Sequence, residues 1–130
     1  MAQIMVVDDS MVARMMLKPI LLGGGHSVVC EAANGAEAVE YYRQYRPDLV
    51  TMDITMPVED GIAAAMQIRA EFPEARIVMV TSMSDNEHVM GALNAGAAHY
   101  ILKPFKPEKV LDVLEKVLAA GKPELGPQTS

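Results

Sequence analysis

Polar side chains directly follow four of the apolar runs in this sequence. They are Asp8 and Asp9 after residues 4–7, Asp53 after residues 49–52, Thr81 and Ser82 after residues 77–80, and Lys103, which precedes Pro104, after residues 99–102. Carboxylates held within a few ångström repel and raise one another's pKa, so their proximity makes sense when a cation lies among them. Mg²⁺ prefers oxygen ligands, including phosphate oxygens, and a lysine ammonium group suits phosphoryl oxygens. If they converge, these side chains predict phosphoryl transfer to a carboxylate, which forms an acyl phosphate.

The alternation of apolar runs with helical patterns indicates how these side chains are brought together. The continuous, β-branched runs predict strands covered on both faces, at residues 4–7, 27–30, 49–52, 77–80 and 99–102. Helical patterns follow them at residues 11–22, 36–45, 62–72, 87–95 and 107–119. We therefore predict an α/β fold, a (βα)5 doubly wound parallel five-stranded sheet of order 2-1-3-4-5 with helices on both faces. In that order strands 1, 3, 4 and 5 are contiguous, so their carboxyl ends share one crevice.

One residue conflicts with this pattern. Pro19 lies well inside the first helical pattern and cannot donate to the carbonyl four residues back, which costs roughly 3 kcal/mol. We expect either a kink at this proline or an irregular last turn, which the glycines at residues 23–25 would accommodate.

The composition limits the class of protein. A length of 130 residues suggests one domain, expected over residues 1–119, with residues 120–130 as a flexible tail. The net charge of −6, without a basic run, argues against nucleic acid or an anionic membrane as the main partner. The single cysteine fits a reducing cytosol, and no stretch approaches the length of a membrane helix. We therefore expect a cytoplasmic protein without membrane insertion.

Each polar residue at a strand end also has a purely structural interpretation. Asp8 and Asp9 could support the start of the following helix, and Asp53 or Thr81 could belong to turns. Lys103 alone could be an ordinary surface lysine. Their joint occurrence at four strand ends favours a functional site. The three histidines show no pairing typical of zinc ligands and are interpreted as surface or loop residues.

Four segments together resemble the receiver domain of response regulators. They are VVDDS, TMDITMPVEDG, VMVTS and NAGAAHYILKPF, which occur in the order and spacing of that family. The resemblance covers residues 3 to 119 and implies a flavodoxin-like fold. Within the family, the VDDS start, the Met-rich first helix and the DITMP loop are most similar to stand-alone chemotaxis regulators.

The resemblance implies a role for each residue of the acidic cluster. Asp53 matches the phosphoacceptor, and Lys103 matches the lysine that assists the transfer. Asp9 matches the residue that binds Mg²⁺ directly, and Asp8 its neighbour that acts through water. The backbone carbonyl of Thr55 would be a further metal ligand, and Mn²⁺ could replace Mg²⁺.

The resemblance also implies a switch and a means of tuning its lifetime. Thr81 matches the switch hydroxyl, and Tyr100 matches the aromatic residue whose rotamer follows the switch. Thr55 and Met83 match the positions that tune hydrolysis of the phosphorylated aspartate. The family commonly has a cis peptide bond before the proline that matches Pro104.

The implied partners are a histidine kinase of the chemotaxis type and a flagellar motor switch or other target protein. Output would use the fourth helix, fifth strand and fifth helix, since no effector domain is expected after residue 119. A separate phosphatase is also expected, because Met83 has no strong donor or acceptor to orient an attacking water. The protein is expected to be a monomer and a phosphoacceptor signalling protein, not an enzyme. The alternatives are a phosphorelay intermediate, a Mg²⁺-dependent aspartyl-phosphate hydrolase and a structural adaptor.

Overall fold

The computed structural model of the protein describes residues 1–56, 58–82 and 91–120. Its strands are β1 (Gln3–Val7), β2 (Ser27–Ala32), β3 (Leu49–Asp53), β4 (Ile77–Thr81) and β5 (His99–Leu102). Its fully described helices are α1 (Met11–Gly23), α2 (Gly35–Tyr45), α3 (Gly61–Glu71) and α5 (Pro107–Ala119). Of the helix predicted over residues 87–95, residues 91–94 are helical and residues 87–90 lie outside the described residues. The predicted tail, apart from Ala120, also lies outside them.

The five strands form one parallel sheet in the order β2-β1-β3-β4-β5, which confirms the predicted order. Every residue of the central strands β3 and β4 is buried, including the polar Thr51, Asp53 and Thr81, as expected for strands that are covered on both faces. The edge strand β2 continues two residues beyond its predicted end, through Glu31 and Ala32. An edge strand tolerates a charged side chain because part of it remains open to solvent.

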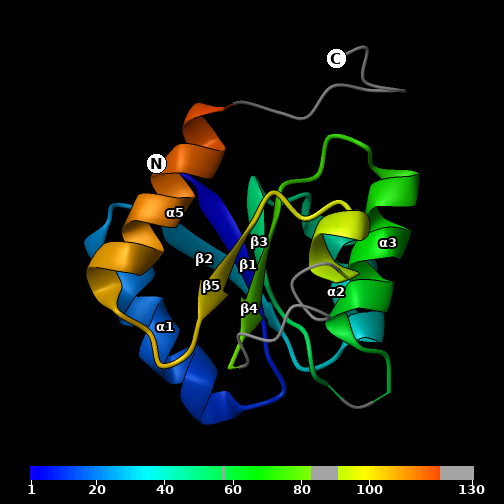
Figure 1. Ribbon diagram of the computed structural model, residues 1–130, viewed down its shortest axis with the longest axis horizontal. Helices are drawn as coiled ribbons and strands as arrows, with labels where there is room; N and C mark the ends of the chain where they lie inside the picture. The colour runs from blue at the N-terminus through cyan, green and yellow to red at the C-terminus, as the bar shows by residue number, and fades with distance from the viewer. Residues whose placement is uncertain (57, 83–90, 121–130) are drawn as a thin grey trace.

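Helices cover both faces of the sheet, with α1 and α5 on one face and α2 and α3 on the other (Figure 1). Each face has its own apolar core. Met5, Met52 and Met79 belong to the core on the α2 and α3 side. Ile4, Leu49 and Val78 belong to the core on the α1 and α5 side. Successive residues of one strand thus enter opposite cores, as the pleat dictates. Among the described residues, no helix has the length and hydropathy needed to cross a membrane.

Pro19 lies inside α1, which continues past it to Gly23. The end of the helix is irregular, since the N–H of Gly24 donates to the carbonyls of both Ile20 and Leu21 at 3.2 and 3.1 Å. The N–H of Gly25 donates to Leu22, three residues back, at 3.0 Å. Of the two outcomes expected from the sequence, a kink at Pro19 or an irregular last turn, the second is therefore present.

Candidate functional site

The strand register brings the carboxyl ends of the central strands to the same level. Val7 of β1 pairs with Met52 of β3, so the next residues, Asp8 just after β1 and Asp53 at the end of β3, lie side by side. In the same way, Thr81 of β4 pairs with Leu102 of β5, immediately before Lys103. The parallel strands thereby place Asp8, Asp53, Thr81 and Lys103, which are far apart in the sequence, at the carboxyl end of the sheet.

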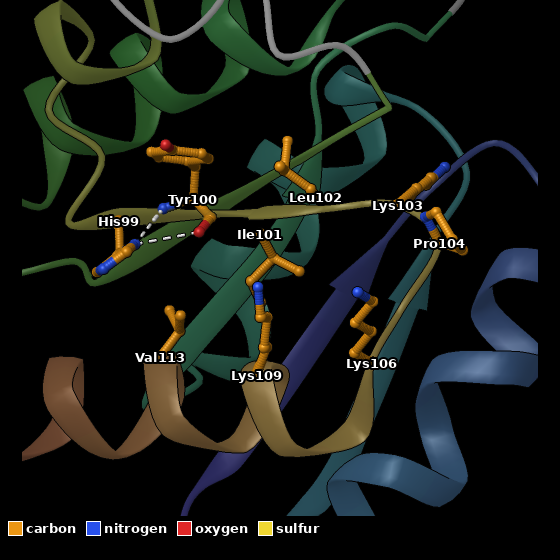
Figure 2. Close-up of a pocket in the computed structure, with 9 residues that line it drawn as sticks. All are labelled: His99, Tyr100, Ile101, Leu102, Lys103, Pro104, Lys106, Lys109 and Val113. Atoms are coloured by element: carbon orange, nitrogen blue, oxygen red, sulfur yellow. Dashed lines mark hydrogen bonds between the residues drawn. The ribbon is translucent and has the colours of Figure 1, made fainter.

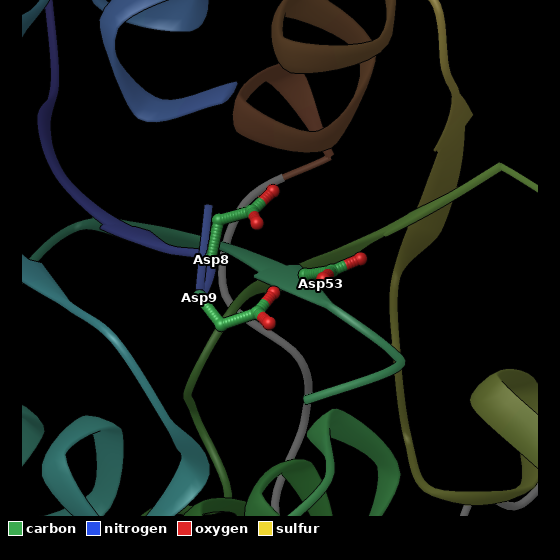
Figure 3. Close-up of side chains that lie close together, drawn as sticks. All are labelled: Asp8, Asp9 and Asp53. Atoms are coloured by element: carbon green, nitrogen blue, oxygen red, sulfur yellow. The ribbon is translucent and has the colours of Figure 1, made fainter. Parts of the chain in front are cut away.

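The carboxylates of Asp8, Asp9 and Asp53 form a cluster in which one oxygen of each lies within 4.8 Å of the others. Figure 3 shows the three side chains at the end of β1 and β3. Asp8 and Asp53 are buried and Asp9 is exposed. An all-oxygen set at this spacing, with one open side, suits a hard divalent cation that keeps several water ligands. The residues present therefore fit Mg²⁺.

Lys103 links two members of this acidic cluster. Its Nζ lies 2.9 Å from Oδ2 of Asp8 and 3.7 Å from Oδ1 of Asp53. The other oxygen of Asp8 accepts a hydrogen bond from the N–H of Ser10 at 2.9 Å. Burial alone would lower the pKa of Lys103, but its hydrogen bond to Asp8 and the charges of Asp53, Asp8 and Asp9 raise it overall. The ammonium group therefore stays charged beside the carboxylates.

Asp53 is the most perturbed of the three acids. Burial raises its pKa from 3.8 to about 6, and the charge of Asp8 acts in the same direction. Lys103 opposes this shift, as does the hydrogen bond from the N–H of Ile54, while Asp9 adds to it. The ionised carboxylate is thus held at a cost in free energy that a bound cation would reduce.

The loop after β3 is shaped by a close contact with α3. Asp60 caps α3 by accepting a hydrogen bond from the N–H of Ala63 at 2.8 Å. The N–H of Gly61 donates to the carbonyl of Ile54 at 2.8 Å. A Cβ on Gly61 would lie 2.0 Å from the carbonyl oxygen of Asp53. This close contact between Gly61 and the backbone of Asp53 could not be inferred from the sequence and required the structure.

Thr55 and Met83 are the two positions predicted to tune hydrolysis of the phosphorylated aspartate, and the structure describes only Thr55. Thr55 is exposed two residues after Asp53. Met83 lies outside the described residues. The peptide bond between Lys103 and Pro104 is cis, as the resemblance implied.

Thr81 and Tyr100 project from the same face of the sheet. Tyr100 pairs with Met79, and Thr81 lies two residues beyond Met79 on β4, so both side chains point to one side. Thr81 is buried, and the half-buried Tyr100 packs against the core on the α2 and α3 side. This geometry provides a short route between the end of β4 and the edge strand β5.

A pocket of about 330 Å³ lies between β5 and α5. Figure 2 shows Ile101 and Val113 pointing into this space, with Lys109 projecting from α5, Lys106 just before that helix, and the Tyr100 ring on the opposite side of β5. The pocket therefore combines an apolar floor with a positively charged rim. Of its lining residues, Lys106, Lys109 and Val113 were not singled out from the sequence.

One histidine is a loop residue, as interpreted from the sequence, but is not at the surface. His26 lies in the loop before β2, but its side chain is buried, with 8% exposed. Its Nδ1 accepts a hydrogen bond from the N–H of Ala2 at 3.1 Å. Burial, together with the charge of the N-terminus, lowers its pKa. This histidine therefore serves the packing of the N-terminus against the loop before β2.

The fold and the acidic site define the class of this protein. The family model of the response regulator receiver domain matches residues 4–115, and the chain belongs to this family. Receiver domains are signalling modules of two-component response regulators and bind Mg²⁺ at an acidic pocket.

Chemotaxis regulators are among the most similar relatives. The chemotaxis protein CheY of Bacillus subtilis is 48% identical over 116 residues, which cover 89% of this chain and 97% of that protein. CheY of Thermotoga maritima is 45% identical over 115 residues, 88% of this chain and 96% of that protein. A chain in the crystal structure of the CheX–CheY–BeF3–Mg²⁺ complex from Borrelia burgdorferi superposes with a TM-score of 0.86 at 34% identity. That match covers 89% of this chain and 88% of the other.

Proposed function

We propose that this protein is a single-domain response regulator of chemotaxis signalling that accepts a phosphoryl group on Asp53 from a histidine kinase. One observation carries the proposal: the buried Asp53 carboxylate lies beside Asp8 and Asp9 and 3.7 Å from the Nζ of Lys103. The similarity to CheY proteins over most of their length supports the chemotaxis assignment. The receiver domain spans residues 1–119 in this proposal.

The proposed reaction transfers a phosphoryl group from a phosphohistidine to a carboxylate oxygen of Asp53. The new P–O bond forms as the P–N bond breaks, and the electron pair leaves with the imidazole nitrogen of the donor. The Lys103 ammonium group, already within 3.7 Å of Asp53, binds a phosphoryl oxygen of the product. At pH 7 a pKa of about 6 leaves most Asp53 side chains ionised and able to attack.

The proposed metal ligands combine this acidic cluster with a backbone carbonyl that the family resemblance implies. Asp9, Asp53 and the backbone carbonyl of Thr55 would hold Mg²⁺, or Mn²⁺, directly. Asp8 would act through water, because its two oxygens already accept hydrogen bonds from Ser10 and Lys103. When bound, the cation neutralises charge on the carboxylates and on the transferred phosphoryl group.

Phosphorylation would change the output face through Thr81 and Tyr100. The Thr81 hydroxyl would move toward the phosphoryl group, and the space it leaves would admit the Tyr100 ring, which projects from the same face of the sheet. Such coupling typically changes partner affinity by about 5- to 150-fold. The target, a flagellar motor switch protein, would bind the face formed by β5, α5 and the helix before β5.

Acetyl phosphate and Mg²⁺ provide the first test. Intact-protein mass spectrometry should show one added phosphoryl group on the wild type and none on Asp53→Asn. Asp112→Asn is a matched control, because Asp112 is an exposed acid on α5, paired with Lys116 at 3.0 Å, and it should be labelled normally. Wild-type labelling of Asp53→Asn would refute the assignment of the phosphoacceptor.

A pull-down with and without beryllofluoride, a phosphoryl mimic, tests the partner. Enrichment of a motor switch protein only with beryllofluoride supports the proposal. Transfer of the phosphoryl group from Asp53 to a histidine phosphotransfer protein would instead identify a phosphorelay intermediate. A phosphatase that shortens the lifetime of phosphorylated Asp53 would complete the set of expected partners.

A further inference from the structure

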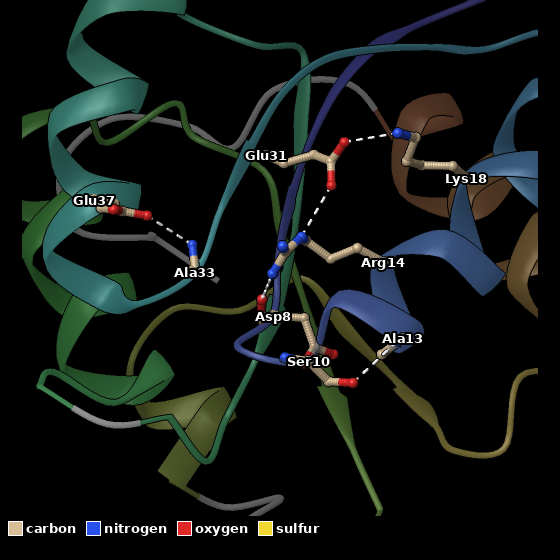
Figure 4. Close-up of polar contacts among 8 residues, drawn as sticks. All are labelled: Asp8, Ser10, Ala13, Arg14, Lys18, Glu31, Ala33 and Glu37. Atoms are coloured by element: carbon tan, nitrogen blue, oxygen red, sulfur yellow. Dashed lines mark hydrogen bonds and ion pairs between the residues drawn. The ribbon is translucent and has the colours of Figure 1, made fainter.

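Arg14 connects α1 to the backbone that carries the acidic cluster. One guanidinium nitrogen, Nη1, donates a hydrogen bond to the carbonyl oxygen of Asp8. Its Nε donates to Oε1 of Glu31 on β2 at 2.9 Å. Figure 4 shows the guanidinium group between these two acceptors. Only 15% of the Arg14 side chain is exposed, so this geometry is shielded from solvent.

Glu31 gives the arginine a firm anchor. Its second oxygen accepts a hydrogen bond from Nζ of Lys18 at 2.7 Å (Figure 4). The hydrogen bonds from Lys18 and Arg14 lower the pKa of Glu31, so its carboxylate remains charged at neutral pH. Glu31 itself pairs with Val6 in the sheet. The guanidinium group is therefore bonded to β2 through Nε, while its Nη1 donates to the Asp8 carbonyl.

This contact controls the direction in which the chain leaves β1. The N–H of Asp8 donates to the carbonyl of Ala32 at 3.0 Å, which fixes one side of the residue. Arg14 fixes the other side, at the Asp8 carbonyl. Because the peptide unit is planar, the orientation of this carbonyl also sets the position of the Asp9 Cα. Within the described part of the chain, no hydrogen bond or ion pair holds the exposed Asp9 carboxylate, so the position of its backbone decides which of its rotamers reach the Asp53 carboxylate.

We propose that Arg14 is a positioning residue for the metal site, which aims the Asp9 carboxylate at that of Asp53 by holding the Asp8–Asp9 peptide. The inference rests on the proposed function in that the metal is the Mg²⁺ of phosphoryl transfer. The direction in which Mg²⁺ affinity changes when Arg14 is removed distinguishes a positioning role from a charge effect. A guanidinium charge near a cation site repels the cation, so removing that charge by itself strengthens Mg²⁺ binding. Loss of positioning weakens it.

Calorimetric titration of the full chain with Mg²⁺, without a phosphodonor, separates these effects. Arg14→Ala should bind Mg²⁺ at least about 10-fold more weakly, the usual effect of losing a group that orients a metal ligand. Arg14→Lys keeps the charge but cannot donate to Asp8 and Glu31 from one planar fork, so it should also bind more weakly. Arg43→Ala is the matched control. Arg43 pairs with Glu71 through Nε at 2.9 and 3.0 Å in an exposed contact between α2 and α3.

The control variant should keep the wild-type Mg²⁺ affinity. If Arg14→Ala binds Mg²⁺ as tightly as the wild type or more tightly, Arg14 acts only through its charge or not at all, and the inference is wrong. Circular dichroism in EDTA establishes that each variant is folded. If Arg14→Ala does not fold, the Mg²⁺ affinity of Arg14→Lys provides the test. An affinity equal to or above that of the wild type would then show that the inference is wrong.

Phosphorylation by acetyl phosphate gives a second readout. The Mg²⁺ concentration for half-maximal labelling of Arg14→Ala should rise about 10-fold or more, while the rate at saturating Mg²⁺ should recover toward that of the wild type. A lowered rate that Mg²⁺ does not restore would contradict a positioning role. Failure of the wild type to be labelled on Asp53 would overturn the proposed function, whereas the metal titration would still test Arg14.

Discussion

Replacement of Asp53 by asparagine should stabilise the metal-free protein, by an amount that depends on pH. Burial and the neighbouring Asp8 raise the pKa of Asp53 from 3.8 to about 6 in the folded state. The folded state therefore binds more protons than the unfolded state between these two values. The free energy of unfolding contributed by this group is highest at low pH and falls as the pH rises through this range. Asp53→Asn, which keeps the shape without the charge, should not show this loss.

The structure sets the size of the effect. The difference between a pKa of 3.8 and one of about 6 corresponds to a loss of about 3 kcal/mol above pH 7. Solvent screens it little, since only 6% of Asp53 is exposed. At roughly 4 °C per kcal/mol for a domain of this size, Asp53→Asn should melt up to about 12 °C above the wild type at pH 8. At pH 5 the gain should fall to about half.

Thermal unfolding followed by circular dichroism in EDTA at pH 5 and pH 8 measures both values. Asp112→Asn removes the same charge from an exposed position on α5 and should change Tm little at either pH. Saturating Mg²⁺ should then stabilise the wild type, by about 2.7 kcal/mol at a hundred times Kd. It should stabilise Asp53→Asn less, because one proposed ligand has lost its charge.

A lower Tm for Asp53→Asn than for the wild type in EDTA at pH 8 would refute this reasoning. It would mean that favourable hydrogen bonds, including the one from Ile54, outweigh burial and the charge of Asp8 at Asp53. The electrostatic account of the acidic cluster would then have to be abandoned.

Three further substitutions test other parts of the site. Thr81→Ala should abolish most of the phosphorylation-dependent gain in target affinity, and an unchanged gain in a binding titration would exclude this route. Gly61→Ala should destabilise the fold by about 1–3 kcal/mol, because its Cβ would lie 2.0 Å from the Asp53 carbonyl oxygen; a denaturant titration with wild-type stability would contradict the close contact. Met83→Glu should shorten the lifetime of phosphorylated Asp53, since a carboxylate can orient an attacking water. An unchanged or longer lifetime, followed by loss of label, would count against a tuning role for this position.

Much of the fold could be predicted from the sequence because its signals are local. Continuous apolar runs indicated all five strands to within two residues of their observed bounds, and β5 at its observed bounds. The alternation of strands and helices predicted the order of the sheet. The same local pattern identified Asp8, Asp9, Asp53 and Lys103, since a polar residue after a buried strand is visible without coordinates. Their convergence then follows from the common direction of parallel strands.

Contacts between distant segments were decided only by the tertiary structure. Arg14 reads as an ordinary helix residue, and its role depends on Glu31, which lies 17 residues away on an edge strand. The raised pKa of Asp53 depends on how deeply the loop and the neighbouring strands bury it. His26 is buried because the N-terminus packs over it, with the N–H of Ala2 bonded to its ring 24 residues away. The physical reason is the same in each case: apolar periodicity and turn propensity act over a few residues, whereas desolvation and hydrogen bonding depend on which distant groups the fold brings together.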